Sequence, residues 1–248
     1  MPESDYYWDV IVRSNDCSNQ KKIKFPVLLD YLQEAAWHNA TQLGFSTLDL
    51  MKNDITWVMN RMQVHVHQLP LHNSALKIET WPASMNKYYT KRDFKVYVDE
   101  ELIVESASNW LVMDMATRRL IAIPDYIKDA GFVVDRGNLS EIDGKVTYDE
   151  TMTERESDIQ VSWFDLDIND HVNNTKIYQW VLEGLGSDFL NANEIRYIDI
   201  LFKHEIKKDD VLKSMCYWHE ETGRWKHALM NAKTKQLHAL AESEFIEM

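Results

Sequence analysis

Two stretches of the chain carry apolar residues at three- and four-residue spacing, which predicts two amphipathic helices. The first begins near Pro26 and ends at Gly44; the second begins after Asn173-Asn174 and ends at Gly184 to Gly186. Proline in a first turn, asparagine just before a helix and glycine just after it are typical boundary residues. The apolar positions are Leu28, Leu29, Leu32, Ala35, Ala36, Ala40 and Leu43 in the first helix, and Ile177, Tyr178, Val181, Leu182 and Leu185 in the second.

Runs rich in β-branched and aromatic residues follow each helix and predict strands. Because the same order of elements occurs twice, the pattern predicts two tandem copies of one α+β unit, each a long helix wrapped by an antiparallel sheet. Glycines and dense charge between the halves predict a linker at 131–157, after a domain at 1–130 and before a domain at 158–248. The expected strands are 56–67, 76–81 and 93–98, then 195–203, 211–218 and a tail toward Phe245.

Composition excludes several classes of protein. None of the seven glycines falls in a dinucleotide-binding, P-loop or nucleophile-elbow motif. A net charge of −13, from 27 basic and 40 acidic residues, makes nucleic acid an unexpected partner. No apolar run approaches the length of a membrane span and no signal-like segment is seen, so we expect a cytoplasmic chain whose lone Cys17 and Cys216 stay reduced.

The segment before the second helix carries the most promising chemistry. If Ser162 to His171 is extended, Asp165, Asp167, Asn169 and His171 share one face, just ahead of a helix N-terminus whose backbone N–H groups could bind an oxyanion. The alternative is an ordinary solvated strand face leading into a capped helix. The first half has no such polar set, and this asymmetry favours a site.

The run from Asp165 to Asn174, followed by 178–183, resembles the hallmark of the acyl-acyl-carrier-protein thioesterases of plants and bacteria. Shorter stretches at 43–46, 57–62, 78–81, 91–93 and 116–120 resemble the first half of that family, so the likeness spans about residues 5–245. The resemblance implies two fused hotdog domains, no cofactor and no metal. It also implies hydrolysis of fatty acyl-acyl carrier protein, with an acidic carrier protein as the partner and a homodimer left open.

The resemblance further implies a catalytic set of Asp167, Asn169, His171 and Glu205. Glu205 or His171 would activate a water, or Glu205 would attack directly, while Asn169 positions the water or the thioester and Asp167 holds its neighbours. Backbone N–H groups near 172–174 would bind the oxyanion. Plant relatives carry a cysteine where this chain has Ile206, so a mechanism that needs that thiol is excluded.

Three alternatives stay open: an acyl-CoA thioesterase, a hotdog dehydratase or hydratase, and a non-catalytic acyl-binding module. An acidic carrier would need a basic patch on this chain. The candidates form two clusters: Lys87, Lys91, Arg92, Arg118 and Arg119, or Lys203, Lys207 and Lys208.

Two further groups of side chains are candidates for binding. His65 and His67 share a strand face, but no familiar set of metal ligands completes them. The candidate linings of an acyl tunnel are Trp37, Trp57, Trp81 and Trp110.

Overall fold

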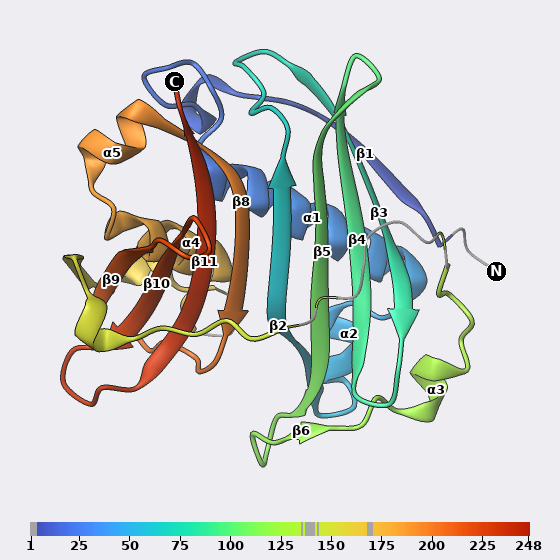
Figure 1. Cartoon of the computed structure of the whole chain (residues 1–248). Helices are drawn as coiled ribbons and strands as arrows, with labels where there is room; N and C mark the ends of the chain where they lie inside the picture. Colours follow the sequence, from blue (N-terminus) through green and yellow to red (C-terminus); the bar gives the residue numbers. More distant parts are fainter. Residues whose placement is uncertain (1–3, 135, 137–141, 143, 168–170) are drawn as a thin grey trace. The chain divides into compact units, whose positions relative to one another are not determined.

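The computed structural model describes residues 4–134, 136, 142, 144–167 and 171–248. The chain divides into two compact units, Met1–Ile142 and Asp143–Met248. No helix among the described residues is long and apolar enough to cross a membrane. Each unit contains one principal helix and one antiparallel sheet (Figure 1).

The N-terminal unit has a sheet in the order β1-β3-β4-β5-β2, in which every neighbouring pair is antiparallel and β6 adds to β5. Helix α1 packs against β1 and β3 and lies across the strands of this unit (Figure 1). The strands are β1 (Tyr6–Ile11), β2 (Ile55–Val66), β3 (Ala75–Met85), β4 (Tyr89–Val98), β5 (Glu101–Asp114) and β6 (Leu120–Ile121). The helices are α1 (Phe25–Leu43), α2 (Thr47–Met51), α3 (Asp125–Lys128) and the 3₁₀ helix η1 (Ser14–Asp16).

The C-terminal unit repeats this topology, with strand order β7-β9-β10-β11-β8 and antiparallel pairing throughout. Helix α4 packs against four of these strands. The strands are β7 (Arg155–Gln160), β8 (Asn193–Phe202), β9 (Val211–His219), β10 (Arg224–Asn231) and β11 (Leu237–Glu247). The helices are α4 (Asn174–Glu183), α5 (Ser187–Ala192), and the 3₁₀ helices η2 (Glu150–Met152) and η3 (Trp163–Asp165). The identical strand permutation confirms the predicted α+β duplication.

The two long helices begin and end where their boundary residues indicate. Gly44 ends α1 in the left-handed region, at φ 79°, which glycine adopts without strain, and its N–H donates to the carbonyls of Ala40 and Thr41. Asn173 caps α4, because its side chain accepts the N–H of Thr175 at 2.9 Å. Both predicted helices are therefore confirmed, although α4 stops at Glu183, ahead of Leu185.

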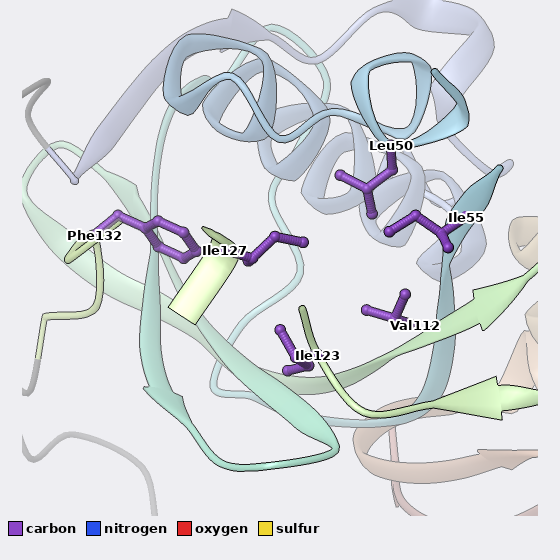
Figure 2. Close-up of a cluster of buried hydrophobic side chains, with 6 residues drawn as sticks. All are labelled: Leu50, Ile55, Val112, Ile123, Ile127 and Phe132. Atoms are coloured by element: carbon purple, nitrogen blue, oxygen red, sulfur yellow. The ribbon is translucent and has the colours of Figure 1, made fainter. Parts of the chain in front are cut away.

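A local apolar cluster lies within the N-terminal unit (Figure 2). Ile127 and Phe132 pack there with residues from α2, β2 and β5. Phe132 falls within the stretch that the sequence assigned to a linker, yet its ring is buried in this cluster. The full set is Leu50, Ile55, Val112, Ile123, Ile127 and Phe132.

Strand β4 carries charged residues that the fold buries. Lys91 is 4% exposed and pairs with Asp93, at 3.3 Å between Nζ and Oδ1. Arg92 is 8% exposed, and its Nη1 donates to Asn39 Oδ1 at 2.7 Å and Thr80 Oγ1 at 3.2 Å. Burial alone lowers the pKa of Arg92 to about 10. The expectation that Lys91 and Arg92 belong to a carrier-docking surface is therefore wrong.

Candidate active site

A short loop ahead of α4 holds the polar residues singled out from the sequence. Leu166 and Val172 form an antiparallel bridge, in which Asp167 N–H donates to the His171 carbonyl at 2.7 Å and Asn173 N–H donates to the Asp165 carbonyl at 2.9 Å. The loop is therefore pinched at its base, and His171 leaves it just before the helix. Asn169 falls between Asp167 and His171 in the sequence and lies outside the described residues.

The loop brings His171 beside Glu205, which lies between β8 and β9, 34 residues further along the chain. His171 Nε2 and Glu205 Oε2 are 3.6 Å apart, and the two side chains are 29% and 37% exposed. This separation is longer than a direct hydrogen bond, but catalytic pairs are often looser before substrate binds. An acid–base pair that solvent reaches can act on a water or on a bound thioester.

Two backbone contacts hold this pair in place. The carbonyl of Ile206 accepts the N–H of Val172 at 3.2 Å, so the residues that follow His171 and Glu205 are joined directly. Asp167 Oδ1 accepts the backbone N–H of His171 at 3.3 Å. The Asp167 carboxylate therefore acts on the main chain of His171, and Ile206 fixes the segment that carries Glu205.

The predicted extended strand from Ser162 to His171 is wrong over its first part. Residues 163–165 form η3, because Ser162 N–H and Oγ both donate to the Asp165 carboxylate, at 2.8 and 2.7 Å. Lys176 Nζ lies 3.3 Å from the same carboxylate. Asp165 is thus directed to Ser162 and the first turn of α4. The spacing of Ser162 and Asp165 is that of a capping box, a signal that was readable from the sequence.

The electrostatics of Asp165 agree with this structural role. Burial raises the pKa of its carboxyl, but the hydrogen bonds from Ser162 and the charge of Lys176 outweigh burial and leave the pKa below its ordinary value. Asp165 is therefore an anion at neutral pH that anchors the start of the loop that leads to His171.

The predicted oxyanion donors are engaged elsewhere at two of the three positions. The N–H of Val172 donates to Ile206, and that of Asn173 donates to Asp165. Both bonds also pinch the loop that holds His171, so using either N–H for an oxyanion would open the site. The expectation that Val172 and Asn173 bind the oxyanion is therefore wrong.

The remaining candidates lie in varied surroundings. Trp81 is fully buried on β3, where the guanidinium of Arg136 stacks over its ring, while Trp57 Nε1 donates to the Phe45 carbonyl at 2.8 Å. Trp110 Nε1 donates to Ser108 Oγ at 2.8 Å, and Trp37 is half-buried on α1.

Within the described ranges, no three His, Cys, Asp or Glu side chains gather in an arrangement able to hold a metal ion.

Sequence reasoning missed the residues that anchor the Glu205 segment from β11. The main chain and imidazoles of His204 and His238 hydrogen-bond to each other and to Leu237. No local sequence pattern predicts this contact, because 34 residues separate the two histidines and neither belongs to a recognisable motif.

Comparisons with known proteins identify the family. Residues 4–130 match the model of the acyl-ACP thioesterase N-terminal domain, and residues 148–247 match the C-terminal domain. The fold matches a solved 12:0-ACP thioesterase from Umbellularia californica with a TM-score of 0.89 at 22% identity, over 98% of both chains. An acyl-ACP thioesterase from Bacteroides thetaiotaomicron gives 0.87 at 19% identity, also over 98% of both chains.

The architecture is thus a pair of tandem hotdog domains. Together with the matches to both family models, this shows that the chain belongs to the acyl-ACP thioesterase family. A palmitoyl-acyl carrier protein thioesterase of Gossypium hirsutum is 29% identical over 82% of this chain, and an oleoyl-acyl carrier protein thioesterase of Arabidopsis thaliana is 28% identical over 83%. The chain spans 52% and 60% of the lengths of these two chloroplastic relatives.

Proposed function

We propose that this protein hydrolyses the thioester of fatty acyl-acyl carrier protein and releases the free fatty acid. The observation that carries the proposal is the approach of His171 to Glu205, at 3.6 Å, in a chain whose two halves both match the family. Asp167, Asn169, His171 and Glu205 are the proposed catalytic set.

In the proposed reaction a water is the nucleophile. Glu205 or His171 accepts a proton as the water oxygen bonds to the thioester carbonyl carbon. The carbon–sulfur bond then breaks, and the proton passes to the departing thiolate. Because a thiolate is a good leaving group at neutral pH, this step needs no strong acid. Asp167 supports the step by holding the backbone of His171.

The cysteines of the chain support water over a thiol nucleophile. Ile206 stands at the position expected to hold the plant cysteine, and its side chain is 1% exposed. Cys216 is fully buried, and burial raises the pKa of its thiol to about 12. Cys17 lies in the N-terminal unit, and burial likewise raises its pKa. A reactive thiolate would need the opposite shift.

The acidic carrier protein is the proposed partner, and a basic surface beside the site supports it. Lys203, Lys207 and Lys208 are exposed on the segment that carries Glu205. A carrier docked there would have to extend its thioester arm only a short distance to reach His171. Lys87, Arg118 and Arg119 are exposed on the N-terminal unit and form the second candidate surface.

We further propose that the chain works in the cytoplasm, where reduced cysteines such as Cys17 and Cys216 are normal. The active unit is either one chain or a homodimer, and sedimentation of the purified protein will distinguish the two.

Thiol release from a series of acyl-carrier and acyl-CoA substrates tests the function. We expect release from acyl-carrier substrates, and about a 10²–10⁴-fold lower kcat for Glu205→Gln and for His171→Ala. Glu220→Gln, an exposed glutamate after β9, is the matched control and should behave as wild type.

The same substrate series distinguishes the alternative functions. Thiol release only from acyl-CoA would favour a CoA thioesterase. Hydration or dehydration of an acyl chain without release would favour a hydratase, and binding without turnover an acyl-binding module.

A further inference from the structure

The segment that carries Glu205 is joined to the start of β11 by hydrogen bonds of two histidines, His204 and His238. His238 Nδ1 lies 3.1 Å from the His204 carbonyl, and His204 Nδ1 lies 2.9 Å from the Leu237 carbonyl. In the main chain, Lys203 and His204 N–H both donate to the His238 carbonyl, at 2.8 and 3.4 Å. Four hydrogen bonds therefore hold the two residues before Glu205.

The partners determine which ring nitrogens carry hydrogen. A backbone carbonyl only accepts hydrogen bonds, so Nδ1 must be the donor in both imidazoles. In neutral His238 this leaves Nε2 as a bare acceptor, and Nε2 is buried without a hydrogen-bond partner among the described residues. His204, by contrast, is exposed.

Burying an imidazole with one nitrogen unsatisfied is unfavourable. His238 is nevertheless 2% exposed, and in the part of the chain that the structure describes its ring hydrogen-bonds to the His204 carbonyl alone. Through this bond the buried imidazole acts on the geometry of the segment that carries Glu205.

The accepted carbonyl is adjacent to the proposed catalytic carboxylate. The carbonyl of His204 belongs to the peptide unit that contains the N–H of Glu205, so the bond from His238 orients the plane that leads into Glu205. On the other side, the Ile206 carbonyl accepts the N–H of Val172, next to His171. Glu205 is thus held at both ends, once from β11 and once from the catalytic loop.

We propose that His238 is a positioning residue: through Nδ1–H it fixes the peptide before Glu205 and thereby the reach of the carboxylate to His171. This role rests on the proposed thioesterase function. The residue does not touch the reacting atoms and takes no part in proton transfer.

Two substitutions separate the hydrogen bond from the space that the ring fills. His238→Leu keeps much of the volume but removes the donor, whereas His238→Asn can place its amide N–H where Nδ1–H stood. We expect kcat for acyl-carrier hydrolysis to fall about 10–100-fold in His238→Leu with KM within about twofold of wild type, and His238→Asn to recover most of it.

A double-mutant cycle with Glu205→Gln tests the route of the effect. If His238 acts through Glu205, His238→Leu will lower kcat little further once Glu205 is Gln. The same fold loss in both backgrounds, a change in KM alone, or an Asn variant as impaired as the Leu variant would overturn the proposal.

Crystal structures of the variants give a readout that does not depend on turnover. The distance between His171 Nε2 and Glu205 Oε2 should increase in His238→Leu and stay near 3.6 Å in His238→Asn. An unchanged distance in His238→Leu would refute the positioning role. Absence of thiol release by the wild type would instead refute the proposed function, and the structures would still decide the role of His238.

Discussion

The carbonyl of Ile206 accepts the N–H of Val172 at 3.2 Å, and this contact joins the two chain segments that bring Glu205 and His171 together. The side chain of Ile206 is buried, so the residue contributes to the site through its backbone and to the core through its side chain. Position 206 is therefore a structural one in this chain.

Ile206→Cys should leave the mechanism unchanged. We expect this variant, in a Cys17→Ser background, to lose about 1–2 kcal/mol of stability, because a smaller side chain leaves a cavity. Its thiol should react slowly with iodoacetamide, and alkylation should not track activity. Leu71→Cys, at an exposed position, is the control that should react quickly. Fast alkylation of the Ile206→Cys thiol would contradict the buried, structural place of residue 206.

Asp165→Asn should loosen the base of the loop that leads to His171. The substitution removes the charge that holds Ser162 and Lys176, so we expect a loss of about 1–2 kcal/mol and a lower kcat. The pKa of Asp165 is lower in the folded state, so its contribution is present above the unfolded pKa of about 3.9 and is lost as pH falls through the folded pKa.

Urea unfolding at neutral and acidic pH measures this contribution. The difference between wild type and Asp165→Asn should shrink toward low pH, and Asp9→Asn, at an exposed position, should show no such trend. A difference that is the same at both pH values would mean that the charge of Asp165 is not the stabilising feature.

His227 should make the stability of the protein pH-dependent. It is fully buried beside Ser243, with Nε2 2.7 Å from Oγ, and burial lowers its pKa to about 3. The unfolded chain takes up a proton below about pH 6.5 while the folded protein does not, so stability is complete above that pH and declines toward pH 3. Between pH 7 and 5 this group alone should remove about 2 kcal/mol.

His227→Gln should flatten this part of the curve, since glutamine does not titrate and can still reach Ser243. His72→Gln, at an exposed position, is the control. Equal slopes for wild type and His227→Gln between pH 7 and 5 would show that His227 does not stay neutral in the folded protein.

Charge reversal beside Glu205 should weaken docking of the carrier. For Lys207→Glu/Lys208→Glu we expect KM for acyl-carrier substrates to rise about tenfold or more at low salt, with kcat and the turnover of small thioesters unchanged. Lys87→Glu reports on the alternative surface of the N-terminal unit. If only Lys87→Glu raises KM, docking is on that surface. Lys91→Glu and Arg92→Glu should instead lower stability, because both positions are buried.

Much of the fold was readable from the residues. Proline, asparagine and glycine mark the ends of α1 and α4, and β-branched runs mark most of the strands, because these signals depend on neighbours within a few positions. The repeated order of elements predicted the duplication that the two identical strand orders confirm. The motif from Asp165 to Asn174 pointed to the family.

The tertiary structure alone determined which charged side chains are buried and which groups they contact. Lys91 and Arg92 resembled a surface patch in the sequence, but their partners Asp93, Asn39 and Thr80 give them buried places. The sequence predicted that the Asp165 side chain shares a strand face with the site residues. In the structure its carboxylate instead accepts a hydrogen bond from Ser162 and lies beside Lys176, because a local cap and a nearby cation stabilise it there.

The candidate site shows most clearly which features follow from the sequence and which depend on the tertiary structure. The residue types of Asp167, His171 and Glu205 are encoded locally, and their chemistry follows from their functional groups. The arrangement of His171 and Glu205 depends on two sets of hydrogen bonds. His238 joins β11 to the Glu205 segment, and Ile206 joins that segment to Val172, next to His171. Such bonds connect positions about 34 residues apart, where no periodicity links one residue to the other, so only the folded chain brings His171 and Glu205 together.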